Sequence, residues 1–269
     1  MNFNKRRWDS GKKTILGETG AFTGEDVIDI IFRQGGAARY LSKKLWEYFV
    51  YEGPSEGGVD ALAKVFAGND FKVEPLLREI FLSREFYSEK AIRTQIKSPI
   101  QFLVGLCRQM ELSGLPTAYL AGAQVQLGQV LFQPPNVAGW DWGQAWINTN
   151  SLLTRYNVAG VITKGVSAET LAVPRGPEGN KERMARGLKF VEKNWQGPNY
   201  EKLVPREMRG DSKSLVEALM FRLFQSSLGE SDRIKFMEFA DAQRGVVFTN
   251  TEIAELVHLM MSSPQYQLT

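Results

Sequence analysis

The sequence predicts an all-α protein: an irregular helical bundle with long loops that contain proline, glycine and tryptophan. Apolar residues recur at helical spacing along most of the 269 residues. The apolar–polar alternation of half-buried strands is hard to find anywhere. Residue types that start and stop helices punctuate the apolar pattern, so helices joined by irregular segments are expected.

Four helices are expected before residue 98. The first begins after an N-cap at Thr23, with Asp26 in its first turn, and stops at the glycines 35–36. The second has one apolar side and one charged side, as a half-buried helix does. A turn rich in Gly and Pro then leads to a short helix near residues 58–67 and to a fourth helix from about Val73.

The tetrapeptide "SPIQ" is the clearest helix start. Ser98 is the expected cap, Pro99 needs no donor at the first helical position, and Gln101 closes a capping box. Further helices are expected near residues 117–130 and 148–163, with an irregular stretch between them.

The last hundred residues read as two connectors and four helices. Residues 165–178 have the Gly and Pro density of a connector, and "NKERMARGLKFVEKNW" after them predicts a charged helix. A second connector leads to helices near residues 211–227, 231–243 and 250–261. The last of these begins behind "TNTE", another capping box.

Two segments echo each other. "LLREIFLSREF" from Leu76 and "LVHLMMSSPQY" from Leu256 both run from an apolar helix into a serine turn and an aromatic residue. We expect Phe86 and Tyr266 to fold back onto their helices. The echo is interpreted as a repeated packing device.

Composition limits the kinds of partner. The chain has 33 basic and 30 acidic residues, a formal charge of +3, and no basic stripe that would fit phosphates, so no nucleic-acid partner is expected. The apolar runs fall far short of the about 20 residues of a membrane span, so none is expected. One cysteine and one histidine exclude an internal disulfide and nearly exclude zinc, and an all-oxygen metal site stays open. No metal and no cofactor are predicted.

Common catalytic signatures are missing from the sequence, which has no phosphate loop, no GxGxxG, no HExxH and no GxSxG. Cys107 lies on the apolar face of its helix and is interpreted as a buried, inert thiol. His258 lies beside the apolar stripe of the last helix and is interpreted as a structural or surface residue rather than a general base. Acidic residues near Asp26 are explained by the helix dipole. Asp9 has no such explanation, and its glycine-punctuated segment is either a frayed terminus or a docked loop.

Residues 131–157 are the best candidate for a site. Pro134 and Pro135 force an extended path, Gly139 permits a turn, and Asn136 favours one, so a rigid non-helical loop is predicted. Tryptophans beside polar groups can stack on sugars or other flat ligands. The candidate binding residues are Asn136, Trp140, Asp141, Trp142, Trp146, Asn148 and Arg155, with Asn150 and Asn157 as further polar partners.

The same residues also fit a brace. The tryptophans would then fill the gap between helices, while Asn148 or Thr149 caps the next helix. The brace is the simpler interpretation. The burial of the tryptophans distinguishes a brace from a binding site. Rings packed between helices, with Arg155 paired to Asp141 or to a loop carbonyl, favour the brace. Ring faces open to solvent favour binding.

Several of these stretches resemble one known family. They are "KSPIQFLVGLCRQM" from Lys97, "LGQVLFQPPNVAGWDWGQAWINTNSLLTRYN" from Leu127, "WDSGKKTILGETG" from Trp8 and "MMSSPQYQL" from Met260. They resemble the bacterial domain-of-unknown-function family numbered 1800. The resemblance covers essentially the whole chain. It implies that the chain corresponds to the C-terminal half of a typical member.

The resemblance carries no activity, but it implies a context. Members are generally exported, which implies a periplasmic or cell-surface location. They often sit beside genes of a sulfatase-like family numbered 1501, so such a protein is a possible partner, as is the N-terminal half that typical members have. Members usually show His-Asp where this chain has Trp8 and Asp9. Because the segment matches the family, Asp9, Gly11 and Lys13 are interpreted as a docked loop.

The expected organisation has four parts. Residues 1–20 form an extended docked segment, and 21–165 form the main helical domain with the PPNVAGW loop. Residues 166–210 form a connector with one charged helix. Residues 211–269 form a three-helix segment that packs on the main domain.

Three functions stay open. The first is a binding or assembly module of an exported bacterial system, with the loop as contact surface. The second is a hydrolase acting on polysaccharide or its esters through carboxylates such as Asp9 and Asp141. The third is a purely structural role, with the loop as an internal brace. The lack of a nucleophile, base or metal cluster in the sequence favours a protein that is not an enzyme.

Overall fold

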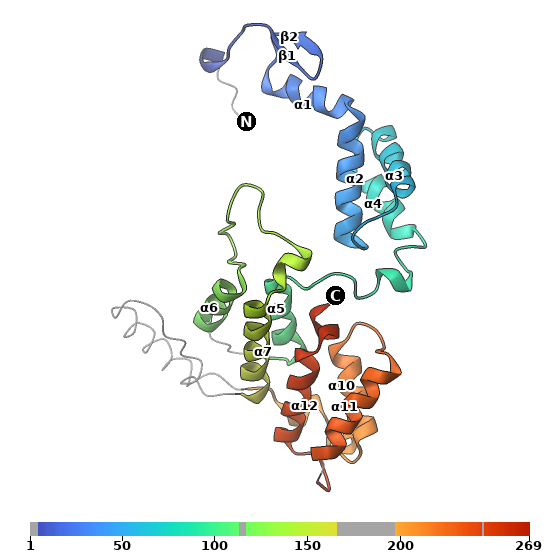
Figure 1. The fold of residues 1–269 in the computed structure, drawn as a ribbon, viewed down its shortest axis with the longest axis vertical. Coiled ribbons are helices and arrows are strands. Elements are labelled where there is room, and N and C mark those ends of the chain that lie inside the picture. Colours follow the sequence, from blue (N-terminus) through green and yellow to red (C-terminus); the bar gives the residue numbers. More distant parts are fainter. Residues whose placement is uncertain (1–4, 113–116, 166–196, 244) are drawn as a thin grey trace, which may run out of the picture. The chain divides into compact units, whose positions relative to one another are not determined.

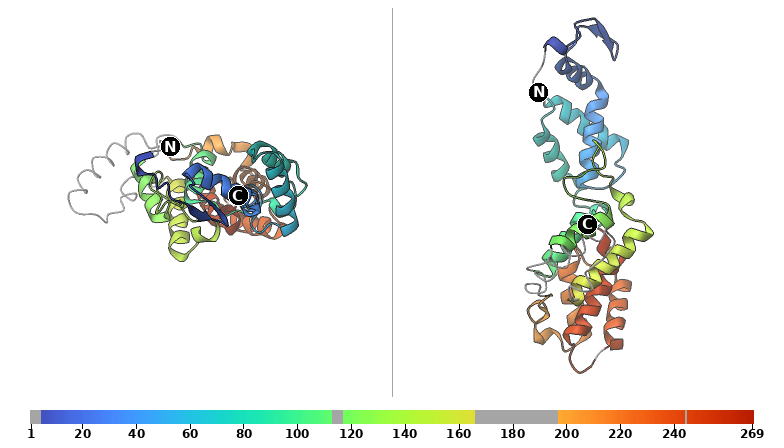
Figure 2. Two further views of the ribbon diagram at one scale, coloured as in Figure 1. Left: turned by 90° about the horizontal axis from the view of Figure 1, so that it is seen from above. Right: turned by 90° about the vertical axis from the view of Figure 1, so that its left-hand side faces the viewer.

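Helices form two compact units, Met1–Thr94 and Gln95–Thr269. The computed structural model describes residues 5–112, 117–165, 197–243 and 245–269. Among these residues the only sheet has two strands, so the predicted helical class is confirmed (Figures 1 and 2).

Unit 1 contains a small β-hairpin, four α-helices and two short 3₁₀ helices among its described residues. Its elements are η1 (Lys5–Arg7), β1 (Lys13–Ile15), β2 (Glu18–Gly20), α1 (Gly24–Arg33), α2 (Gly35–Phe49), α3 (Glu56–Gly68), α4 (Val73–Leu82) and η2 (Glu89–Ala91). The strands pair antiparallel, and Leu16 and Gly17 form the turn with φ angles of 49° and 88°. The hairpin was not predicted, because three residues a strand are too few to show an alternation.

Three helices of unit 1, α2, α3 and α4, pack around one apolar cluster. Trp46 of α2, Phe66 of α3 and Leu76 and Ile80 of α4 are buried together in it.

The predicted start of α1 is confirmed, because Thr23 and Asp26 form a reciprocal capping box.

The repeated packing device is also confirmed. Ser83 ends α4 and donates its hydroxyl to the Ile80 carbonyl at 2.8 Å, and Ser263 donates to the Met260 carbonyl at 2.7 Å in unit 2. The aromatic residue that follows each serine returns to the core. Phe86 packs edge-on against Phe81 with ring centroids 5.2 Å apart, and Tyr266 is 1% exposed.

Unit 2 holds the larger core and the candidate site. Its elements are α5 (Pro99–Gln109), α6 (Thr117–Leu127), η3 (Gly143–Trp146), α7 (Thr149–Lys164), α9 (Tyr200–Leu203), η4 (Arg206–Met208), α10 (Ser212–Leu223), α11 (Glu230–Gln243), α12 (Asn250–Ser262) and η5 (Pro264–Gln267). The expected capping boxes are present at Ser98–Gln101 and Thr249–Glu252, so both helix starts are confirmed.

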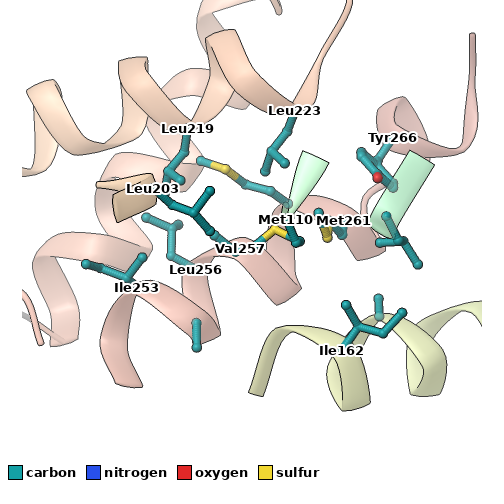
Figure 3. Packing of buried hydrophobic residues seen from close by; sticks show 14 of the residues in the cluster. Met110, Ile162, Leu203, Leu219, Leu223, Ile253, Leu256, Val257, Met261 and Tyr266 are labelled. Atoms are coloured by element: carbon teal, nitrogen blue, oxygen red, sulfur yellow. The ribbon is translucent and has the colours of Figure 1, made fainter. Parts of the chain in front are cut away.

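Helices distant in the sequence build this core. α7 lies beside α12, and α10 packs with α11 (Figures 1 and 2). Figure 3 shows Met110 at the C-cap of α5, Ile162 of α7, Leu219 of α10 and Val257 of α12 converging on one cluster.

The division by contacts differs from the four parts expected from the sequence. The boundary lies between Thr94 and Gln95, and α7 and α10–α12 on both sides of residues 166–196 belong to one unit, because α7 packs on α12. The predicted charged helix between residues 179 and 196 lies outside the described residues.

A glycine allows α7 and α12 to approach closely. A Cβ on Gly160 would lie 2.9 Å from Cε1 and 3.0 Å from Nε2 of the buried His258 ring. His258 is itself held, because its Nε2 lies 3.0 Å from the Tyr156 carbonyl and its ring packs on the Tyr156 ring. Burial lowers the pKa of His258, so the neutral ring donates this bond.

Gly160→Ala should therefore destabilise unit 2 by about 1–3 kcal/mol, because the new methyl group meets a ring that cannot move away. The matched control is Gly122→Ala, at an exposed position of α6 with no neighbour within 4 Å. That change should stabilise by about 0.5–1 kcal/mol. Urea unfolding of both variants measures the difference, and equal effects would contradict this account of the α7–α12 contact.

Candidate functional site

The segment between α6 and α7 has an exposed part and an anchored part. Residues 131–142 form an open loop that projects from the helices of unit 2 (Figure 1); we call it the PPN loop. Phe132 is 94% exposed and Val137 is fully exposed. Residues 143–148 return to the protein, and Trp146 is only 8% exposed. The two interpretations of this stretch therefore apply to different parts of it.

A tight turn gives the PPN loop its shape. The Asn136 side chain accepts a hydrogen bond from the Ala138 amide at 2.8 Å, and its carbonyl accepts one from the Gly139 amide at 3.1 Å. Gly139 has a φ of 91°, which a residue with a side chain rarely adopts. The predicted role of Asn136 in a turn is confirmed, and the turn presents Val137 at its tip.

Two glutamines fix the start of the PPN loop. The Leu131 amide donates to Oε1 of Gln124 at 3.1 Å, which ties the loop to α6. The Ile100 amide donates to Oε1 of Gln129 at 3.0 Å, which ties it to the first turn of α5. Sequence reasoning missed both glutamines, since their partners are distant or lie in an irregular segment.

The far end of the loop is held by the start of α7. Asn148 and Ser151 form a reciprocal capping box, and the Ser151 hydroxyl also donates to the Trp146 carbonyl at 2.9 Å. The expected cap at Asn148 is therefore confirmed. Trp140 is half-buried and Trp142 is 52% exposed.

The predicted binding residues thus fall into two groups. Asn148, Trp146 and Arg155 are occupied by structural contacts. Trp142 and Asp141 are exposed on the loop.

Arg155 occupies the interior of unit 2. Its side chain is 2% exposed, and Nη2 donates to the Lys97 carbonyl at 2.7 Å while Nη1 donates to Oε1 of Gln267 at 3.2 Å. The guanidinium lies 4.9 Å from the Phe102 ring centroid, a cation–π contact. The expected partners, Asp141 or a carbonyl of the PPN loop, do not appear among the hydrogen bonds that the described residues form with Arg155.

Lys97 completes what we call the Lys97–Arg155 cluster, which also includes Tyr266 and Gln267. Nζ of Lys97 donates to the Tyr266 carbonyl at 2.7 Å and lies 3.8 Å from the centroid of its ring. The Lys97 amide donates to the Gln267 carbonyl at 2.8 Å. The Tyr266 hydroxyl in turn meets Oε1 of Gln109 at 2.5 Å. The cluster joins three elements: the start of α5, the middle of α7 and η5.

The electrostatics of the cluster are unusual. Burial lowers the pKa of Arg155 to about 10, and burial together with the charge of Arg155 lowers the pKa of Lys97 to about 8. None of the ion pairs among the described residues includes either side chain. Buried Arg209 differs, since Glu201 lies 3.3 Å from it.

Sequence reasoning missed Lys97, Tyr266 and Gln267 as partners of Arg155. The signal was present in part, because Lys97 opens the "KSP" stretch, while Tyr266 and Gln267 lie in "SSPQYQL". Spacing alone could not bring these stretches together.

The predicted docked loop lies in unit 1. Oδ1 of Asp9 accepts from the Gly11 amide at 2.8 Å, and Nζ of Lys13 donates to the Gly11 carbonyl at 3.0 Å. Trp8 donates its indole N–H to the Phe22 carbonyl at 3.1 Å. These bonds order the segment locally, and docking on a further surface stays a prediction.

The stretch of sequence from α6 through α7, which includes the PPN loop, is poor in charge. From Leu112 to Thr163 the sequence has only two charged residues, Asp141 and Arg155, and Arg155 is buried. Apolar side chains nevertheless reach solvent from α6, the PPN loop and α7. They are Val125, Leu131, Phe132, Val137, Trp142, Leu152, Leu153 and Tyr156, each at least 43% exposed. Exposed apolar residues without charge are typical of contact surfaces.

Fold and site define a predominantly helical protein, in which a rigid, nearly uncharged aromatic loop is held between helices joined by a buried guanidinium. The family described as "Protein of unknown function (DUF1800)" matches residues 1–268, and the chain belongs to this family. No curated protein and no solved structure matches it.

The described residues contain no group of three or more His, Cys, Asp or Glu side chains placed to hold a metal ion. None of their helices is long and apolar enough to cross a membrane.

Lys97→Met should change how the free energy of unfolding depends on pH. The folded-state pKa of Lys97, about 8, lies below the ordinary value of 10.5, so between these values the unfolded chain binds more protons. The free energy of unfolding therefore rises with pH between about 8 and 10.5. Below pH 8 Lys97 is charged in both states, so the folded protein bears the whole cost of burying that charge.

The difference in the free energy of unfolding between the wild-type protein and Lys97→Met should shift in favour of the wild type by about 1–2 kcal/mol as the pH rises from about 7.5 to 9.5. This figure allows for the partial exposure of the side chain. Urea unfolding of both proteins at each pH gives the difference. A difference that stays constant over this range would contradict the proposed burial of Lys97.

Proposed function

We propose that this protein is a binding or assembly module of an exported bacterial system and that the PPN loop contacts its partner. The observation that carries the proposal is the exposure of Phe132, Val137 and Trp142 on a loop within a stretch of sequence that has only two charged residues. Interface cores are depleted of charged residues and enriched in aromatic ones.

The anchoring of the PPN loop supports the same proposal. Gln124 and Gln129 hold its start, the Asn136 turn fixes its tip, and the Asn148 cap holds its end. A loop that is already ordered loses little conformational entropy when a partner binds. A brace alone would not need its apolar side chains in solvent.

The proposed partner is a sulfatase-like exported protein of the family numbered 1501. This expectation, and the periplasmic or cell-surface location, come from the family context. The PPN loop fits a partner whose contact area is likewise apolar and uncharged, since the loop itself offers a buried charge no opposite charge apart from Asp141.

No observation favours the hydrolase. Asp141 is exposed on the PPN loop, and the Asp9 carboxylate already accepts the Gly11 amide and lies 3.7 Å from Nζ of Lys13. A glycosidase would need two carboxylates about 5–10 Å apart in one cleft.

The double variant Phe132→Ala, Trp142→Ala tests the proposal. Both side chains reach solvent, so the free energy of unfolding should change little, while affinity for a 1501-family protein from the same genome should fall at least about tenfold. Calorimetric titration of the purified proteins measures it.

The matched control is Phe221→Ala on α10, because Phe221 is 91% exposed and apolar but lies outside the uncharged stretch. It should bind as the wild type does. Equal binding by all three proteins would exclude the PPN loop as the contact surface, and absence of binding by the wild type would exclude this partner. Unfolding of the double variant would instead support the brace.

A further inference from the structure

An apolar pocket lies open on α4 of unit 1. It has a volume of about 530 Å³, and we call it the α4 pocket; its lining residues, all from one face of that helix, are Glu74, Leu77, Arg78, Phe81 and Leu82. Leu77 and Phe81 also pack against the core of unit 1, whereas Leu82 is 68% exposed. Concave apolar surfaces of this kind are typical of contact sites.

The two charges of the α4 pocket have no partners in the described part of the chain. Arg78 and Glu74 are both exposed, and neither belongs to an ion pair that the described residues form. Burying either charge without a partner would be costly. The pocket therefore suits an apolar occupant that brings a carboxylate for Arg78 and an uncharged donor for Glu74.

The PPN loop offers an apolar side chain that its own fold does not use. Phe132 is the third residue of a turn that the Gln133 amide closes on the Val130 carbonyl at 3.1 Å, and its φ of 64° is a conformation that suits glycine. Burial of the ring does not offset this strain, because Phe132 is 94% exposed. Strained residues of this kind gather at contact and binding sites, where the strain serves a function.

We propose that the α4 pocket is the docking site for the PPN loop of a second copy of this chain. The Phe132 ring enters the pocket and covers the exposed sides of Leu77 and Phe81. Each copy carries one loop and one pocket, so the contact is made twice in a two-fold dimer.

Charge complementarity selects this occupant. Asp141 is the only charged residue of the PPN loop and, like Arg78, belongs to none of the ion pairs between described residues. A carboxylate and a guanidinium that meet in a contact neutralise each other. Trp142, the next residue, is 52% exposed and carries an indole N–H that suits Glu74. The loop thus brings one group for each charge of the pocket.

The inference rests on the proposed function in one respect, because both use the PPN loop as a contact surface. A second copy and the sulfatase-like partner therefore compete for the loop. The α4 pocket serves the second copy alone, so a change in the pocket separates the two contacts.

Charge reversal tests the contact on the whole purified chain. The wild type should form a dimer that grows with concentration in sedimentation velocity between about 10 μM and 1 mM, the range of a contact below standard size. Arg78→Glu and Asp141→Arg each bring like charges together and should weaken dimerisation at least about tenfold, as should Phe132→Ala. The matched control Lys213→Glu makes the same charge change at an exposed position of α10 and should dimerise as the wild type does.

A wild type that stays monomeric over this range, or equal dimerisation by the control and the three variants, would overturn the proposal.

Mixing the two charge variants tests whether the occupant is a second copy. In an equimolar mixture of Arg78→Glu and Asp141→Arg, the introduced arginine of one protein faces the introduced glutamate of the other, while the original aspartate faces the original arginine. Dimers should reappear in the mixture although each variant alone forms few. A mixture that dimerises no better than its components would overturn the pairing between copies.

Calorimetric titration keeps this inference apart from the proposed function. Arg78→Glu leaves the PPN loop unaltered, so it should bind the 1501-family protein at least as tightly as the wild type does. A monomeric wild type that binds this protein would overturn the dimer alone. A dimeric wild type that does not bind it would overturn the proposed partner alone.

Discussion

The burial of the Arg155 guanidinium is the interaction on which the rest of unit 2 depends. One side chain, 2% exposed, connects α7 to Lys97, two residues before α5, and to Gln267 in η5, through the Lys97 carbonyl and the Gln267 side chain. A planar group with five donors suits this position better than an ammonium group would, because it can serve several acceptors at fixed angles and still lie against the Phe102 ring. This arrangement leaves a buried positive charge without an opposite charge beside it. One effect is on Lys97, whose pKa is lowered by burial and by the charge of Arg155.

The same helices also hold the PPN loop. The Ile100 amide of α5 donates a hydrogen bond to the Gln129 side chain just before the loop. α7 begins at the Asn148 cap, which follows the end of the loop. Because the Lys97–Arg155 cluster joins α5 and α7, both ends of the loop rest on elements that the buried guanidinium connects. The exposed apolar side chains are therefore presented from a fixed frame. The brace and the contact surface are two parts of one stretch. The part around the buried Trp146 is the brace, and the exposed tip at Val137 belongs to the contact surface.

Sequence reasoning predicted what is local. Helix starts at Thr23, Ser98 and Thr249, the Asn136 turn and the return of Tyr266 each depend on residues within a few positions, and the structure has all of them. The partners of Arg155 lie 58 and 112 residues away, and no spacing rule selects them among many polar side chains. The hairpin was missed because its strands are short. Exposure of Phe132 and Val137 was also beyond prediction, since apolar residues in a loop are usually expected to fold inward.

Hydrogen exchange in Arg155→Met tests the central claim most directly. The Lys97 amide donates to the Gln267 carbonyl at 2.8 Å, and the Thr269 amide donates to the Gln95 carbonyl at 2.7 Å, so both report on the joint between α5 and the end of the chain. If the guanidinium holds this joint, both amides should lose at least about tenfold of their protection, while amides within α10, such as Leu219, keep theirs. Unchanged protection at Lys97 and Thr269, or the same loss throughout α10, would contradict the account.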